Sequence, residues 1–520
     1  MLARVGESST PSEQSTNQPW WFHRHAYPRN MNSSAEVPAG YNTPVPDQIM
    51  TPDSVETRLG TLEFADGFPS DETAAKVFDH LDFSRAVEVF LQCIPAASME
   101  GLRRGLNEVG CVAAHRVALA DQLLDSSPLF LTGNTDTVYA LAMLDLDRDG
   151  PTVVEIPPGC GPGTVNDTWF RFVTDMGAPG PDRGAGGNYL LVPTGYAGEI
   201  PDGYFVAESP SGVNLLALRG FLVDGKTDAA KAMFEDGVKI YPLSTADDQP
   251  KMEFTSISGK TFNTIHANDK DFYEELAAVI TREPIEMIDP ETRGLLASIG
   301  IHKDLPFDPD ERMRGILRDG AAVGNATARA ICFKTRDPRA YYYADRKWKT
   351  GFVGGDYRWL DGDGRGGRNF DARTLFFYQA TLNTPAMALE MVGVGSQYAI
   401  SEHDASGEYL SGSNTYRLTL PAGIPAKDFW SLIVYDPQTR SELQTGQPFP
   451  SRSSEKNKDE LTYNSDGSID LTFGSQQPSE RWGNWIETVP GKSWYAILRL
   501  YGPLEPWFDK TWVPSDIERL

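Results

Sequence analysis

The chain has 520 residues, of which 40% are hydrophobic and 23% are charged, so its composition is that of an ordinary globular protein. Its 47 basic and 72 acidic side chains leave a formal net charge of −25. A chain this acidic argues against a protein that binds nucleic acid or an anionic membrane surface. Its four cysteines share no close spacing, which argues against a disulfide framework and a thiolate zinc cluster.

Residues 1–58 are rich in Ser, Pro, Asn and Thr and contain no apolar core of a signal peptide. No apolar run approaches the roughly 18 residues that span a bilayer, so we expect a cytoplasmic protein with a partly flexible N-terminal arm. Trp20, Trp21 and Phe22 are expected to dock on the body of the protein or on a neighbouring subunit. His23 and His25 supply only two of the ligands that a structural zinc needs.

A helical segment is predicted over residues 59–127, because apolar residues between Val77 and Leu91 recur at spacings of three and four. Pro95 has no N–H and is expected to end this helical stretch. Helical patterns return in residues 251–402, which we interpret as a connecting region.

Two blocks of short β-prone runs, separated by Gly, Pro and Asp, cover residues 128–250 and residues 403–520. Their spacing is typical of a sandwich or a barrel. The predicted fold is therefore mainly β with α segments (α+β). It has two antiparallel β-sandwich domains of jelly-roll type, helical segments before and between them, and a short C-terminal tail.

One segment, residues 220–227, fits the spacing of a phosphate-binding loop. Its intervening residues are apolar and β-prone and end in Asp224, which would repel a phosphate. Thr227 is more simply interpreted as the N-cap of a following helix. We therefore expect no nucleotide binding at this loop.

One segment has the D-x-D-x-D-G head of a calcium loop, formed by Asp145, Asp147, Asp149 and Gly150. In such a loop, alternating carboxylates converge on one hard cation. The twelfth position is Ile156 instead of the closing glutamate. The alternative interpretation is an acidic hairpin turn. Any bound metal is expected to be a calcium or magnesium ion at these three aspartates.

Polar side chains gather among aromatic residues in the first β block. Arg171 is expected within a strand over residues 168–174, with Trp169 on the same strand. A charged residue inside an apolar strand must find a partner. The alternatives are an ion-pair network at the edge of a sandwich and a ligand pocket.

If the protein is an enzyme, we expect the active site at one mouth formed by these residues, because a fixed guanidinium can hold an oxyanion while a carboxylate moves a proton. The expected catalytic residues are Asp136, Arg171 and Asp182. The expected ligand-binding residues are Asn134, Tyr139, Asp167, Trp169 and Arg183.

The chain also resembles a family of proteins built from two paired domains, Domain of Unknown Function 1254 and Domain of Unknown Function 1214. The segments that carry the resemblance to the first domain are residues 133–139, 167–171, 180–187, 189–193 and 237–242. Those for the second domain are residues 415–421, 429–436, 483–485, 498–503 and 510–514. The resemblance implies two jelly-roll sandwiches joined by helices in a homo-oligomer, and it supplies no reaction and no catalytic residues.

Two classes of function fit these observations. The first is an enzyme that acts on a small organic molecule by hydrolysis or another acid–base step, with carboxylates as the titrating groups because histidine is scarce. The alternative is a non-catalytic ligand-binding protein or an oligomeric assembly protein. A buried carboxylate of raised pKa beside a cavity would favour the first class. A large apolar intersubunit surface without a pocket would favour the second.

Overall fold

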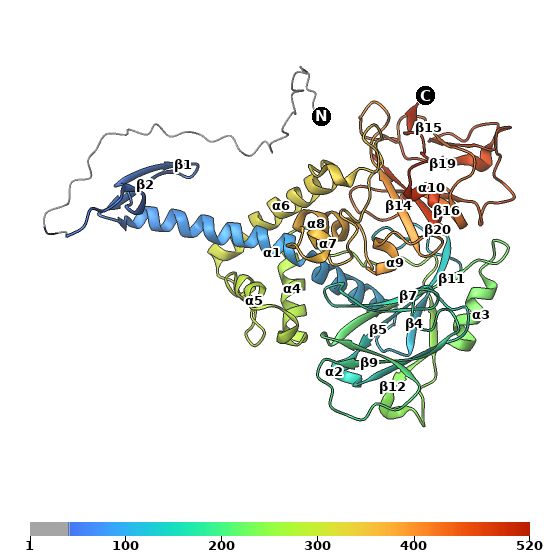
Figure 1. The fold of residues 1–520 in the computed structure, drawn as a ribbon, viewed down its shortest axis with the longest axis horizontal. Coiled ribbons are helices and arrows are strands. Elements are labelled where there is room, and N and C mark those ends of the chain that lie inside the picture. The colour runs from blue at the N-terminus through green and yellow to red at the C-terminus, as the bar shows by residue number, and fades with distance from the viewer. Residues whose placement is uncertain (1–39, 41) are drawn as a thin grey trace, which may run out of the picture. The chain divides into compact units, whose positions relative to one another are not determined.

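The computed structural model describes residue 40 and residues 42–520 (Figure 1). The predicted docking cluster of Trp20, Trp21 and Phe22 and the pair His23 and His25 lie outside the described residues. The described residues divide into two compact units, one that ends at Phe78 and one from Asp79 to Leu520.

The first unit contains a small antiparallel sheet. At these residues the sequence predicts the end of a polar arm and the beginning of a helical segment instead. Its strands are β1 (Ser54–Thr57), β2 (Gly60–Ala65) and β3 (Phe68–Pro69). A short 3-10 helix (Asp47–Ile49) precedes them, and the long helix α1 (Asp71–Glu108) begins directly after them. The sheet is only three strands wide and most of its side chains are exposed, so the hydrophobic periodicity that marks a larger sheet is weak here.

The first sandwich of the second unit consists of two sheets. The larger sheet has, in order, β13 (Glu253–Ser256), β4 (Arg116–Leu119), β5 (Thr137–Asp145), β11 (Val213–Phe221), β7 (Gly163–Asp167) and β8 (Phe172–Met176). The smaller sheet has β10 (Tyr204–Ser209), β9 (Gly187–Pro193), β6 (Thr152–Ile156) and β12 (Lys239–Pro242). One shared core, including Ala140, Leu191 and Ile240, joins the two sheets. The predicted sandwich is confirmed, and β4 and β13 extend it beyond residues 128–250.

The strand β5 is buried on both faces. Val138, Ala140 and Leu144 belong to the core of the sandwich, whereas Tyr139 and Leu141 belong to the core that the helices form on the other face. Because neighbouring side chains of a strand point to opposite faces, both sets must be apolar. This double burial explains the almost continuous apolar run of β5.

Helices cover the outer face of the larger sheet (Figure 1). After α1, the helices α4 (Asp271–Arg282), α5 (Pro290–Ala297), α6 (Glu311–Phe333) and α8 (Phe370–Gln379) contribute buried residues to the core on this face. The remaining ones are α2 (Leu146–Asp149), α3 (Asp228–Gly237), α7 (Asp361–Gly364), α9 (Pro385–Ala388) and α10 (Glu505–Phe508). Within the described part of the chain, no helix combines the length and apolar character needed to cross a membrane.

The prediction that Pro95 ends a helix was wrong, because α1 continues through it. A proline inside a helix removes one backbone hydrogen bond and costs about 3 kcal/mol. Ile94, Ala96 and Ala97 beside it are fully buried in the helical core. Burial of this apolar stretch outweighs the local penalty and keeps the chain helical.

The second sandwich follows the helices and ends the chain. One sheet has β14 (Ser396–Ser401), β20 (Tyr495–Pro503), β16 (Ala426–Tyr435) and β17 (Ser451–Ser453). The other has β19 (Trp485–Glu487), β18 (Ile469–Gly474), β15 (Tyr416–Leu420) and β21 (Glu518–Arg519). Leu432, Leu498 and Leu471 are among the residues of their common core, which confirms the second predicted sandwich.

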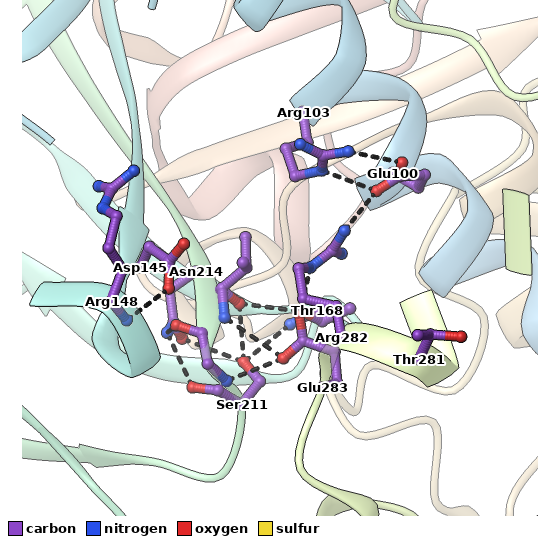
Figure 2. A network of polar contacts seen from close by, with 12 residues as sticks. Glu100, Arg103, Asp145, Arg148, Thr168, Ser211, Asn214, Thr281, Arg282 and Glu283 are labelled. Atoms are coloured by element: carbon purple, nitrogen blue, oxygen red, sulfur yellow. Dashed lines mark hydrogen bonds and ion pairs between the residues drawn. The ribbon is translucent and has the colours of Figure 1, made fainter. Parts of the chain in front are cut away.

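A buried polar network ties α1 to α4 and to the larger sheet (Figure 2). The Glu100 carboxylate accepts hydrogen bonds from Arg103 and from Arg104 at 2.8 Å and from Arg282 at 2.9 Å. Arg282 also pairs with Glu283, whose carboxylate accepts a bond from a backbone N–H before β11. Burial raises the pKa of Glu100, but the arginines outweigh it and lower this pKa to about 2.

We predict that Glu100→Gln lowers the free energy of unfolding by about 2–4 kcal/mol at pH 7, measured by urea denaturation. Breaking a fully buried ion pair costs about 3–5 kcal/mol, and the arginines here are partly exposed, which reduces the loss. Because the pKa of Glu100 is lowered, its contribution is fully present above about pH 4.5 and disappears as the pH falls through about 2.

The matched control is Glu72→Gln, which changes an exposed glutamate of the same helix and is expected to stay within about 0.5 kcal/mol of the wild type. An equal effect of the two substitutions would contradict the role given to Glu100.

Candidate functional site

The loop of residues 132–136 joins the two sandwiches. The Tyr435 hydroxyl donates to the carbonyl oxygen of Gly133 at 2.7 Å, and the Asn134 amide donates to the Tyr501 hydroxyl at 2.6 Å. Both tyrosines lie on strands of the second sandwich, β16 and β20. The loop that precedes β5 is therefore inserted between the two domains.

Asp136 lies in the same loop and is buried, with 1% of its surface exposed. Its carboxylate is 3.4 Å from the Lys456 ammonium, which also donates to the Thr135 carbonyl at 3.0 Å and to Ser451 Oγ at 2.8 Å. Burial lowers the pKa of Lys456, although the charge of Asp136 opposes this shift. The expected catalytic Asp136 thus takes part in a buried ion pair between the domains.

A cavity of about 70 Å³ lies directly beside this loop, between the two sandwiches. Tyr139 and Arg219 reach it from paired positions on β5 and β11. Tyr398 and Arg499 reach it from paired positions on β14 and β20. Each pair projects from the outer face of its own sandwich, so the cavity exists only because the domains face each other.

Two guanidinium groups line this cavity without an ionic partner. Arg219 and Arg499 are buried, with 8% and 6% of their surface exposed. Neither has a carboxylate within 4 Å among residues 40 and 42–520. Arg499 donates to the Thr132 carbonyl at 2.9 Å and to the Tyr435 hydroxyl at 2.7 Å, and its Nε has no partner.

The tyrosines around the arginines do not neutralise them. Burial raises the pKa of Tyr435 and of Tyr501 well above the usual value, so both remain uncharged phenols. Arginine itself stays protonated in proteins. The cavity therefore carries two positive charges that nothing in its lining balances.

A buried carboxylate, Glu442, lies next to the cavity wall. Neither of its oxygens has a hydrogen-bond partner, and a Cβ at Gly133 would lie 2.8 Å from its Oε1, which places this carboxylate directly against Gly133. Burial raises the pKa of Glu442 to about 8. Burial also raises the pKa of Asp175 to about 6, and the positive charge of Arg219 opposes that shift. Both groups can exchange protons near neutral pH.

The structure places Trp169 and Arg171 elsewhere than predicted. They lie in a tight turn between β7 and β8, not on one strand, because the Asp167 carboxylate accepts the backbone N–H groups of both at 2.8 Å. Phe170 between them has a left-handed backbone, with φ of 53°. Trp169 and Arg171 consequently line one and the same larger cavity, and Arg171 forms an ion pair with Asp167.

Asp182 and Arg183 lie in a separate loop. The Asp182 carboxylate accepts bonds from the backbone N–H groups of Gly177, Gly184 and Gly186 at 2.7–3.2 Å and from the Tyr189 hydroxyl. The Arg183 side chain is exposed. The single mouth expected from the sequence is therefore divided into three places: the interdomain cavity with Asn134 and Tyr139, the larger cavity with Trp169 and Arg171, and this loop.

The three aspartates of the expected calcium head surround the helical turn α2. The Asp145 carboxylate caps it by accepting the Arg148 N–H at 3.0 Å, and Asp149 pairs with the Arg148 side chain. Asp147 belongs to the same turn. Throughout the described residues, no three His, Cys, Asp or Glu side chains come together as possible metal ligands, and the calcium or magnesium ion stays a prediction of the sequence.

The sequence interpretation missed Arg219 and Arg499, although the signal was present. Both are charged residues inside apolar strands, β11 and β20. Arg171, for which we predicted a partner, lies in a turn and has one. Arg219 and Arg499 lie on strands, and neither has a carboxylate partner in the described part of the chain.

Comparisons with known proteins agree with this two-domain architecture. Residues 115–242 match the family described as a protein of unknown function (DUF1254), and residues 395–505 match the one described as a protein of unknown function (DUF1214). The crystal structure of the VPA0106 protein from Vibrio parahaemolyticus shares the fold, with a TM-score of 0.53 and 17% identity over 84% of this chain and 100% of that chain.

An uncharacterized protein from Burkholderia cenocepacia is more distant, with a TM-score of 0.37 and 11% identity over 85% of this chain and 96% of that chain. No curated protein matches the chain. The likeness to the Vibrio parahaemolyticus protein concerns the fold alone.

We predict that Asp182→Asn destabilises the protein by about 2–3 kcal/mol, because the loop amides lose a charged acceptor. Thermal or urea unfolding measures the change. Arg183→Ala, next to it and exposed, is the control and should change stability by less than about 0.5 kcal/mol. A normal stability of the Asp182→Asn variant would restore Asp182 as a candidate for catalysis.

Proposed function

The chain belongs to the two-domain DUF1254 and DUF1214 proteins, and we propose that it binds a small organic carboxylate between these domains. One observation carries the proposal. The guanidinium groups of Arg219 and Arg499 face the same buried cavity, and in the described part of the chain neither has a carboxylate within ion-pair distance.

Energetics favour an anionic ligand. A buried charge without a partner costs several kcal/mol, and an anion placed between the two guanidinium groups would remove that penalty. A carboxylate fits because its two oxygens accept paired N–H groups from arginine. Asn134, Tyr139 and Tyr398 line the same cavity and supply further polar groups to orient the ligand.

Size restricts the ligand further. A protein cavity of about 150 Å³ holds benzene, and the interdomain cavity measures about half of that. An acid of two or three carbon atoms matches this volume. We therefore take acetate as the probe and acetamide, which has the same shape but no charge, as its control.

We predict that acetate raises the melting temperature of the full chain and that acetamide does not, because a ligand stabilises the state that binds it. The variant Arg219→Met should lose this effect. Without ligand it should be about as stable as the wild type, since the substitution removes an unpaired buried charge together with one hydrogen bond between Arg219 and Tyr398.

The variant Arg219→Lys keeps the charge and is expected to retain part of the acetate effect. Two results would contradict the proposal: equal shifts with acetate and acetamide, or an acetate effect that survives in Arg219→Met.

An acid–base reaction on the same ligand is the second candidate function. The observation that favours it is Glu442, a buried carboxylate without hydrogen bonds beside Gly133 of the cavity wall. A group of this kind can move a proton near neutral pH. NMR in D2O can follow the exchange of the methyl protons of acetate for deuterium. Exchange that is lost in Glu442→Gln would support an enzyme, whereas no exchange would support a binding protein.

Homo-oligomerisation and a cytoplasmic location remain predictions of the sequence.

We predict that the affinity for acetate falls as the pH rises through about 8. Below that pH Glu442 is protonated and neutral, whereas above it a second negative charge appears beside the arginines and competes with the ligand. Calorimetric titrations between pH 6.5 and pH 9.5 measure the dissociation constant. In Glu442→Gln the decrease should vanish, and a decrease that persists would assign it to another group.

A further inference from the structure

A second cavity, of about 840 Å³, lies between the turn that follows β7, helix α5 and the segment around α8. Pockets that hold small-molecule ligands commonly measure about 300–1,000 Å³. Aromatic side chains form much of the wall, among them Trp169, Phe172, Tyr357, Trp359 and Phe377. The cavity is thus large enough for a ring system and has faces on which such a ring can stack.

Four guanidinium groups reach this cavity, those of Arg171, Arg358, Arg368 and Arg373. The first two are paired with neighbouring aspartates. Arg368 and Arg373 have no carboxylate within 4 Å in the part of the chain that the structure describes. The chain has a net charge of −25, so two guanidinium groups at one cavity without an ion-pair partner in the described residues set this cavity apart from the acidic surface.

The two unpaired arginines are held in place by neutral groups. Arg368 donates to the Arg358 carbonyl oxygen at 2.7 Å, and Arg373 donates to the Gln92 side chain at 2.8 Å. The Nε of Arg373 is buried without a partner. Burial, and next the positive charge of Arg368, lower the pKa of Arg373 to about 10, so both remain charged at neutral pH.

Three carboxylates also line the cavity, those of Glu88, Asp289 and Glu291, and the charges of Glu88 and Asp289 act on Arg373 from beyond ion-pair distance. Asp289 caps α5 by accepting bonds from Thr292, and Glu88 accepts a bond from Gln92. Neither forms an ion pair with Arg368 or Arg373. The positive charge on the arginine side of the cavity therefore remains available to a ligand.

The aromatic wall is fixed in an unusual backbone conformation. Trp359 and Phe170, both bulky, have φ values of 62° and 53°, a region that such residues rarely adopt. Trp359 stacks on Phe352 with ring centroids 5.3 Å apart. Packing thus holds the Trp359 ring in the wall, and strained residues of this kind concentrate at ligand sites.

We infer that this cavity is a second binding site, for an aromatic compound that carries an oxyanion of the phosphate-ester or carboxylate type. The oxyanion would lie between Arg368 and Arg373, and the ring would lie against Trp169 and Trp359. The inference is independent of the proposed interdomain site, because it rests on different residues and a different cavity.

The probe is phenyl phosphate, titrated calorimetrically into the full chain. We expect saturable binding of one molecule, and at least tenfold weaker binding of both phenol, which has the ring alone, and inorganic phosphate, which has the charge alone. Arg368→Gln and Arg373→Gln should each weaken the binding of phenyl phosphate at least tenfold, with unchanged circular dichroism.

The matched control is Arg365→Gln, which removes an exposed arginine from the same segment outside the cavity lining and should leave the affinity unchanged. Saturating acetate should not displace phenyl phosphate, which separates this site from the interdomain one. Absence of saturable binding, displacement by acetate, or equal effects of the three arginine substitutions would overturn the inference. If Arg373→Gln fails to fold, Arg368→Gln alone decides, because Arg368 is exposed.

Discussion

The double burial of β5 is the constraint on which the rest of the structure depends. One face of this strand completes the core of the first sandwich, and the other receives the helices. Its register with β11 places Tyr139 opposite Arg219, and its N-terminal end carries the loop of residues 132–136 that enters the second domain. Because its side chains alternate between two faces, β5 contributes to both cores and to one wall of the candidate site, and the loop before it joins the domains.

The electrostatics of the joint divide into two kinds. Around Asp136 and Lys456 the buried charges are matched and further satisfied by hydroxyl and carbonyl groups, which is the arrangement expected of a structural contact. Around Arg219 and Arg499 the charges are not matched. The domains therefore meet through one neutral cluster and one positive cavity. Only the cavity has an unbalanced charge that a bound anion would neutralise.

Local patterns indicated the two sandwiches and the long helices, because burial of one or both faces of an element leaves a clear periodicity in the sequence, but they missed the strands β1 to β4 and β13 beside the helices. They failed at Pro95, where the propensity of a single residue was outweighed by tertiary packing around α1. They failed again at Trp169 and Arg171, where hydrogen bonds from Asp167 convert an apparently β-prone run into a turn.

By itself, the sequence determined the classes of element, the paired domains and the presence of charged residues within apolar runs. It named Asn134 and Tyr139, which do line the interdomain cavity. Only the tertiary structure decided which charges are neutralised: Arg171 has a carboxylate beside it, whereas Arg219 and Arg499 have none within 4 Å among the residues that the structure describes. The physical reason is that pairing depends on distances of a few ångströms between residues far apart in the chain, and no local pattern records such distances.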